Sequence, residues 1–235
     1  AKQRPELASQ PFHALNLSMI LHPRNPHVPI IHANLRFFQT LGNPSTWWFG
    51  AAMDLNPCYG YLEDCQHWHR TCRAACHGFG EDLYPRLKEA CDNYFYLPHR
   101  QEHRGIGGLW LEHHTASDIL SGFALVSSIG KHIMPGYLPI LRRRNQMQYS
   151  QNQRDFQAYR RGRYVEFNLL CDRGTQYGLR SHRRTEAVLV SMPPLCHWRY
   201  DYRPIEGSPE AKLCEEFLVA RDWLSLELES SNPYS

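Results

Sequence analysis

The stretch Tyr164–Trp198, YVEFNLLCDRGTQYGLRSHRRTEAVLVSMPPLCHW, decides how the fold is read from this sequence. Its first residues, Tyr164–Leu170, are rich in aromatic, β-branched and aliphatic side chains, which predicts a strand that stops at Cys171–Gly174. A second apolar run, Ala187–Val190, leads into Met192-Pro193-Pro194, where the missing proline N–H groups end sheet pairing. The two runs therefore predict a β-hairpin.

Charged residues gather between the two runs. They are Arg173, Arg180, Arg183, Arg184, Asp172 and Glu186. One interpretation is a hairpin with a solvated, charged turn. The other is a receptor for carboxylates or phosphates, because each guanidinium can bind such a group with two parallel hydrogen bonds. A simple turn has no need of four arginines, which favours the receptor.

The pattern YVEFNL-x-x-DRGT-x-x-GL, followed by RTE-x-x-L-x-S-M-PPL-x-x-W, resembles the signature of oxygen-dependent coproporphyrinogen III oxidases, enzymes of haem biosynthesis. Other segments are similar to the same family. They include HPRNPHVP-x-x-HANLRFF (22–38), NPSTWWFG (43–50), DLNP-x-YGY (54–61), FGEDLYPRLKEACD-x-YFYLPHR (79–100) and RGIGGL (104–109).

The resemblance implies a reaction and a fold. Dioxygen oxidises coproporphyrinogen III, two propionates become vinyl groups, and carbon dioxide, hydrogen peroxide and protoporphyrinogen IX leave. It implies no organic cofactor, which agrees with the lack of a dinucleotide, P-loop or zinc motif in the sequence. It also implies a broad antiparallel sheet flanked by helices on both faces, a cleft over the sheet, and a homodimer.

The chemistry asks for fixed cations near four substrate carboxylates and for a base near a pyrrole N–H. Arg36, Arg173 and Arg184 are candidates for the cations. We predict Asp172 as the base, because a carboxylate at a strand end can be aimed inward and Arg173 can keep it ionised.

The resemblance carries further roles over, residue by residue. It makes His32 a proton donor and Ser18, Asn34 and Arg36 substrate contacts, with His182, Arg183 and Arg184 in the arginine-rich segment. In bacterial members the positions of His22, His32, His69 and His99 are described as ligands of a divalent metal such as manganese. For His69 and His99 the alternative is a structural role in packing and hydrogen bonding.

Periodicity predicts the elements. Strands are expected at 15–21, 30–38, 47–51 and 109–111, and helices at 61–76, 81–96, 117–136, 138–162 and 208–223. These occur in blocks without regular βαβ alternation, which predicts a single α+β domain over residues 1–235 with an antiparallel sheet. In 30–38 alternation puts His32, Asn34 and Arg36 on one face, which is either wet or the lining of a polar pocket.

Composition excludes several classes of protein. A net charge of +3 is too small to indicate nucleic-acid binding, and the basic run in 141–163 is predicted to be a solvated helix face. No apolar run approaches a membrane span of about 20 residues. The eight cysteines contain no CxxC pair, so we expect reduced thiols and a cytoplasmic protein.

The chain departs from the family pattern at three places. His182-Arg183 stands where the family has Gly-Gly, Glu112-His113 where it has Asp-Asp, and Gly50-Ala51-Ala52 where it has three glycines. Family members also carry residues before the point that corresponds to Ala1, so the family's N-terminal segment is expected to be missing here. Two other functions stay open: a catalytically impaired member that binds tetrapyrroles, and a module that binds a polyanion.

Overall fold

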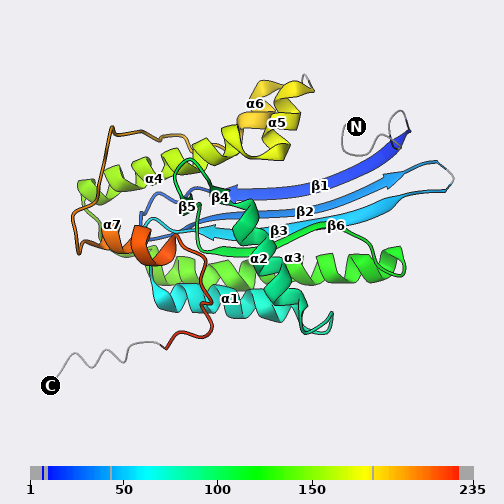
Figure 1. The fold of residues 1–235 in the computed structure, drawn as a ribbon, viewed down its shortest axis with the longest axis horizontal. Coiled ribbons are helices and arrows are strands. Elements are labelled where there is room, and N and C mark those ends of the chain that lie inside the picture. The colour runs from blue at the N-terminus through cyan, green and yellow to red at the C-terminus, as the bar shows by residue number, and fades with distance from the viewer. Residues whose placement is uncertain (1–6, 8–9, 43, 182, 228–235) are drawn as a thin grey trace.

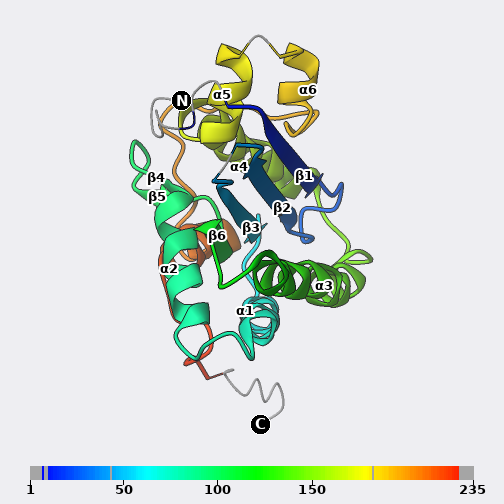
Figure 2. The ribbon, with the colours of Figure 1, turned by 90° about the vertical axis from the view of Figure 1, so that its right-hand side faces the viewer.

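The fold is a four-stranded antiparallel sheet with helices on both faces (Figure 1), seen in a computed structural model of the chain that describes residues 7, 10–42, 44–181 and 183–227. The predicted α+β class and antiparallel sheet are confirmed. Helices α1 and α3 lie on one side of the sheet, and α4, α5 and α6 lie on the other (Figure 2).

The sheet has the order β1-β2-β3-β6. Its strands are β1 (Phe12–Leu21), β2 (Ile30–Thr40), β3 (Trp47–Asn56) and β6 (Gly107–His114), so all four predicted strands exist and are longer than expected. Two short strands, β4 (Tyr96–Leu97) and β5 (Glu102–His103), pair separately. Residues directly opposite each other share a face of a sheet, so the register decides which side chains meet in the site.

The main hydrophobic core fills one side of the sheet. Helix α1 (Leu62–Cys76) packs against α3 (Ile119–Arg144), and α3 packs against β2 and β3. The inward-facing residues of the strands, such as Ile31, Met53 and Leu109, are fully buried there. Helix α2 (Leu83–Tyr94) covers β6. The result is a rigid support under the strands, whose other face is free to carry polar residues.

The prediction of a hairpin in 164–198 is wrong, because the structure is helical there. Helix α4 (Gln151–Leu170) runs through the predicted strand, and two short helices follow, α5 (Arg173–Arg180) and α6 (Thr185–Leu189). Residues 156–168 of α4 are buried on every side, so its sequence carries no polar face and no helical period. Tertiary packing overrides the strand propensity of its β-branched and aromatic residues.

The predicted break between the two long helices is also misplaced. Helix α3 continues past Pro135, Gly136 and Pro139 to Arg144. Gly136 packs directly on the Trp68 ring, since a Cβ there would lie 3.1 Å from it. The real break comes before Ser150, where a capping box starts α4. The Ser150 hydroxyl accepts from the backbone N–H of Gln153, and the Gln153 side-chain oxygen accepts from the backbone N–H of Ser150.

The basic run 141–163 is not a solvated face throughout. Four of its arginines are buried: Arg144, Arg160, Arg161 and Arg163. Arg160 pairs with Glu102 at 2.8 Å and Arg163 with Glu166 at 3.0 Å. Arg160 therefore joins α4 to β5, whereas the Arg163–Glu166 pair lies within α4.

The C-terminal segment begins as predicted, with Ser208 accepting from the Ala211 amide at the start of α7 (Pro209–Lys212). A π-helical segment, Leu213–Phe217, follows, so the predicted helix to residue 223 is too long. All eight cysteines are free thiols. Among the described residues, no helix has both the length and the apolar character needed to cross a membrane.

Candidate functional site

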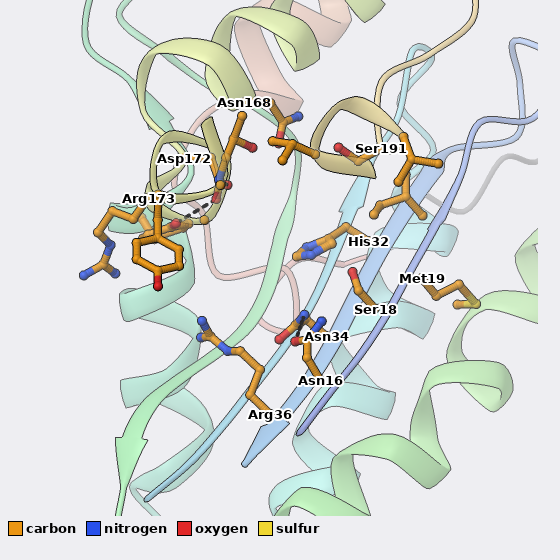
Figure 3. Close-up of a pocket in the computed structure, with 18 of the residues that line it drawn as sticks. Asn16, Ser18, Met19, His32, Asn34, Arg36, Asn168, Asp172, Arg173 and Ser191 are labelled. Carbon is orange, nitrogen blue, oxygen red and sulfur yellow. Dashed lines mark hydrogen bonds between the residues drawn. The ribbon is translucent and has the colours of Figure 1, made fainter. Parts of the chain in front are cut away.

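A cleft of about 990 Å³ lies over the polar face of the sheet and contains most of the predicted site residues. Strands β1, β2 and β6 form its floor, and residues of α2, α4, α5 and α6 form its other walls (Figure 3). The polar row on β2 therefore lines a pocket, as one of the two interpretations of the sequence predicted. Seven predicted residues line the cleft: Ser18, His32, Asn34, Arg36, Asp172, Arg173 and Arg183.

Strand register brings the polar residues of β1 and β2 together. Ser18 lies opposite Asn34, and Ile20 lies opposite His32. The Asn34 amide donates to the Asn16 side-chain oxygen at 2.7 Å, which fixes both side chains on the floor. The floor therefore offers amide and hydroxyl groups to a polar ligand.

Arg36 is the uncompensated cation of the floor. Its side chain makes no hydrogen bond or ion pair with any residue in the described part of the chain, and its guanidinium lies 5.3 Å from the Trp110 ring centroid. A Cβ at Gly50 would come within 3.1 Å of the Arg36 Nε. Gly50 is thus the glycine that makes room for Arg36, whereas Ala51 and Ala52 are fully buried.

His32 is held by a buried carboxylate that the sequence analysis did not single out. Its Nδ1 lies 2.6 Å from Asp54 Oδ1, and Arg104 donates to Asp54 Oδ2 at 2.7 Å. Burial alone would raise the pKa of Asp54, but the charges of Arg104 and His32 outweigh it and lower the pKa to about 2. An ionised carboxylate only accepts, so Nδ1 carries the proton and Nε2 is left to exchange a proton with a ligand.

Asp172 lies between two helices, not at the end of a strand. Its Oδ2 accepts from the Thr175 amide at 2.6 Å and so caps α5, while its Oδ1 accepts from the Tyr94 hydroxyl at 2.9 Å. Burial, together with the negative charge of Asp172, raises the pKa of Tyr94 to about 12, so the phenol stays a donor. Tyr94 is stacked on Trp110 with the ring centroids 3.7 Å apart, which fixes its position.

The prediction that Arg173 keeps Asp172 ionised is not supported by an ion pair between them, because Arg173 pairs with Glu112 instead. Arg173 donates to Glu112 Oε2 at 2.8 Å, and its guanidinium lies 5.0 Å from the centroid of the Tyr94 ring. Arg183 lines the cleft and lies 5.5 Å from the Tyr177 ring centroid. Arg184 does not line the cleft; it is exposed and precedes α6. His182 lies outside the described residues.

The four histidines proposed as metal ligands are not brought together. Both ring nitrogens of the fully buried His69 are occupied, by the Tyr84 hydroxyl at 3.0 Å and the Ile106 carbonyl at 2.9 Å. Burial lowers the pKa of His69 to about 3. The structural interpretation of this residue is therefore the one that fits.

The other three histidines have separate surroundings. His22 donates from Nε2 to the Ser191 carbonyl at 2.8 Å, and His99 Nε2 lies 2.8 Å from Glu166 Oε2. His32 Nδ1 is hydrogen-bonded to Asp54. Nowhere in residues 7, 10–42, 44–181 and 183–227 does a group of three or more His, Cys, Asp or Glu side chains have the placement to hold a metal ion. These residues do not fit a metal centre.

The sequence model of one known family, described as coproporphyrinogen III oxidase, matches residues 1–223. The chain belongs to the coproporphyrinogen III oxidase family. Membership implies an oxidoreductase of porphyrin biosynthesis, with coproporphyrinogen III as its substrate. The cleft suits a ligand of this kind, because a coproporphyrinogen III oxidase needs cations for propionate carboxylates and Arg36, Arg173 and Arg183 face the same space.

Several residues of the site carried no prediction, among them Asp54, Tyr94 and Arg104, and the sequence contained a signal for Asp54. Alternation along β3 puts Asp54 on the same face as Gly50, and the register pairs it with His32. Tyr94 and Arg104 reach the site from a helix end and a loop, where no alternation exists. Their places depend on how α2 and α4 pack around Phe95 and Phe167.

Proposed function

We propose that this protein catalyses the oxygen-dependent oxidative decarboxylation of two propionates of coproporphyrinogen III. For each propionate the balance is CH2CH2COO⁻ + O2 + H⁺ → CH=CH2 + CO2 + H2O2. The observation that carries the proposal is one cleft with Asp172, His32 and an uncompensated Arg36, in a member of this family. The signature in 164–198, which resembles that of the oxygen-dependent enzymes, supports dioxygen as the oxidant.

Asp172 is the proposed base. Its carboxylate lines the cleft, and removal of a proton from a pyrrole N–H makes the ring richer in electrons, so that dioxygen can accept them more readily. Tyr94 donates to one carboxylate oxygen and the Thr175 amide to the other. These two bonds fix the direction of the carboxylate, and each oxygen keeps a lone pair for the substrate.

His32, on the floor of the cleft, is the proposed proton carrier. Asp54 fixes the tautomer with Nδ1–H, and the Nε2 of a protonated His32 could give a proton to the reduced oxygen species. Asp54 itself is 2% exposed and acts through His32. It is therefore a positioning residue.

The test of the reaction is an assay that separates dioxygen from other oxidants. Coproporphyrinogen III is mixed with the protein without oxygen, air is admitted, and protoporphyrinogen is read as its fluorescent porphyrin together with hydrogen peroxide. The proposal expects no product before air and one peroxide per vinyl group after it. Equal product in both phases would show that dioxygen is not the acceptor, and no product with retained porphyrin binding would favour an impaired member.

Substitution of Arg36 tests the carboxylate contact. Arg36→Lys keeps the charge but loses the planar fork that can bind a carboxylate with two hydrogen bonds, so KM is expected to rise by roughly tenfold. Arg184→Lys is the matched control, because Arg184 is exposed and does not line the cleft; its KM is expected to stay within about twofold of the parent. Tolerance of lysine at position 36 would remove Arg36 from substrate binding.

Chelation tests the divalent metal, for which manganese is the candidate. We expect exhaustive treatment with EDTA, followed by removal of the chelator, to change turnover by less than about twofold. The reason is that the nitrogens of His69 are both occupied and that His22, His32 and His99 have other partners. A treated protein that is inactive and regains activity with manganese would show that these histidines rearrange into ligands.

A homodimer is the proposed assembly. Leu15 and Leu17 on the edge strand β1 are 67% and 69% exposed, on the sheet face that packs on α3. Leu120 and Phe123 of α3 are 79% and 57% exposed. Apolar side chains and an open strand edge favour pairing with a second copy. Sedimentation equilibrium measures the mass, and a monomer at micromolar concentration would contradict the dimer.

A cytoplasmic location is proposed from the thiols. Eight free cysteines, five of them buried, are typical of proteins kept in a reducing compartment. Localisation of a tagged full chain by microscopy and fractionation tests this.

A further inference from the structure

The arginines around the cleft differ in how their charge is neutralised. Arg104 and its partner Asp54 are each 3% exposed, so this pair is shielded from water. Arg36 has no acidic partner among the described residues of the cleft. The charge of Arg173 is neutralised less completely than that of Arg104, because Arg173 pairs with Glu112 but the two side chains are 47% and 31% exposed.

The Arg173–Glu112 pair joins the floor of the cleft to one of its walls. Arg173 begins α5, Glu112 belongs to β6, and both side chains line the same space. Glu112 thus accepts a hydrogen bond from the guanidinium that a substrate carboxylate would need. A solvent-exposed pair of this kind contributes little net free energy, so another carboxylate can replace it.

We propose that Glu112 is an internal competitor for the substrate carboxylate that Arg173 binds. In the free protein the Glu112 carboxylate occupies Arg173, and a propionate of the substrate displaces it on binding. Glu112 is then a determinant of affinity for this chain. The inference rests on the proposed function, because it takes a propionate as the ligand of Arg173.

The size of the effect follows from the strength of the pair. An exposed ion pair is worth between about 0 and 1 kcal/mol, so Glu112 occupies Arg173 in between half and about four-fifths of the molecules. Only the remaining fraction, with Arg173 unpaired, can bind the substrate carboxylate. The apparent Kd is the intrinsic Kd divided by that fraction, so it is raised by about two- to fivefold. Glu112→Gln keeps the size of the side chain but removes the competing charge. The variant is therefore expected to bind about two- to fivefold more tightly.

The experiment measures the Kd of coproporphyrin III, a stable porphyrin with four carboxylates, by fluorescence titration of the full chain. Glu186→Gln is the matched control, because Glu186 is an exposed glutamate in the first turn of α6 that does not line the cleft. The decisive measurement is a double-mutant cycle with Arg173→Gln. If Glu112 acts through Arg173, Glu112→Gln has no effect in the Arg173→Gln background.

Each outcome decides the matter. Tighter binding by Glu112→Gln that vanishes in the Arg173→Gln background supports the competitor. Weaker binding by Glu112→Gln would show that the glutamate orders Arg173 for the ligand. Equal tightening by Glu112→Gln and Glu186→Gln, or tightening that persists without Arg173, would reduce the effect to general electrostatics. A parent protein that binds no porphyrin would overturn the proposed function itself. If the parent binds porphyrin and turns over its substrate, but Glu112→Gln has the same Kd as the parent, only this inference is overturned.

Discussion

Asp172→Asn is expected to lower kcat by about 100-fold or more while the protein stays folded, because asparagine cannot accept the proton that a positioned base removes. Asparagine is as good a helix cap as aspartate, so the bond from the Thr175 amide is preserved. The other arm of asparagine is an NH2 group, so the bond to Tyr94 reverses and the hydroxyl oxygen accepts from it; both neighbours keep a hydrogen-bond partner. The substitution therefore removes basicity at Asp172 and little else.

The measurement is steady-state turnover of coproporphyrinogen III in air, with circular dichroism to show retained helix. Asp118→Asn is the control, since Asp118 caps α3 by accepting from the Ser121 amide and does not line the cleft. Its turnover should equal that of the parent. Near-parental turnover of Asp172→Asn would take Asp172 out of the proton transfer and leave it as a cap only.

Asp54→Asn is expected to cost roughly 3–5 kcal/mol of unfolding free energy, the usual range when one partner of a buried ion pair is removed. Arg104 would keep its charge while buried among the rings of Phe95, Tyr164 and Phe167, whose centroids lie 4.0–4.7 Å from the guanidinium carbon. The cation–π contacts replace only part of the lost interaction. Urea unfolding followed by tryptophan fluorescence measures the change.

Acid offers a second way to see the same interaction. The pKa of Asp54 in the folded protein is about 2, below its value of about 4 in an unfolded chain. Its stabilising contribution is therefore complete above about pH 4 and is lost as the pH falls toward 2. The parent is expected to lose more stability than Asp54→Asn across this window.

The control for both experiments is Asp201→Asn. Asp201 lies 3.6 Å from Arg203, and the two side chains are 68% and 84% exposed. Such a pair contributes between about 0 and 1 kcal/mol, so the variant should unfold like the parent. An Asp54→Asn variant that loses less than about 1 kcal/mol would show that Arg104 finds another acceptor.

The sheet could be predicted from the sequence because its strands have one wet and one dry face. In β2 the alternation of His32, Asn34 and Arg36 with apolar residues fixes both the element and the face that lines the cleft. Helix α4 has no such contrast, since residues 156–168 are all buried. Its aromatic and β-branched residues therefore suggested a strand. The capping box at Ser150 was the local signal that could have placed its start.

The site was predictable where it lies on strands and not where it depends on packing between helices. Ser18, Asn34 and Arg36 lie in the cleft because strand register places them there. The partner of Arg173 is Glu112, 61 residues earlier in the chain, and no local pattern joins them. His69 is a similar case, because only the fold shows that both of its nitrogens are already used.

Because the carboxylate of Asp172 is also the cap of α5, the proposed chemistry and the order of this helix are thermodynamically linked. A neutral carboxylic acid attracts the amide dipoles at a helix N-terminus less strongly than a carboxylate does. Each proton that Asp172 takes from a substrate would therefore loosen the first turn of α5, the turn that begins with Arg173. The amide of Thr175 reports on this linkage, and its hydrogen exchange should speed up in a complex that holds the proton. In this protein one wall of the cleft would then be least firmly held at the moment when the substrate has just reacted.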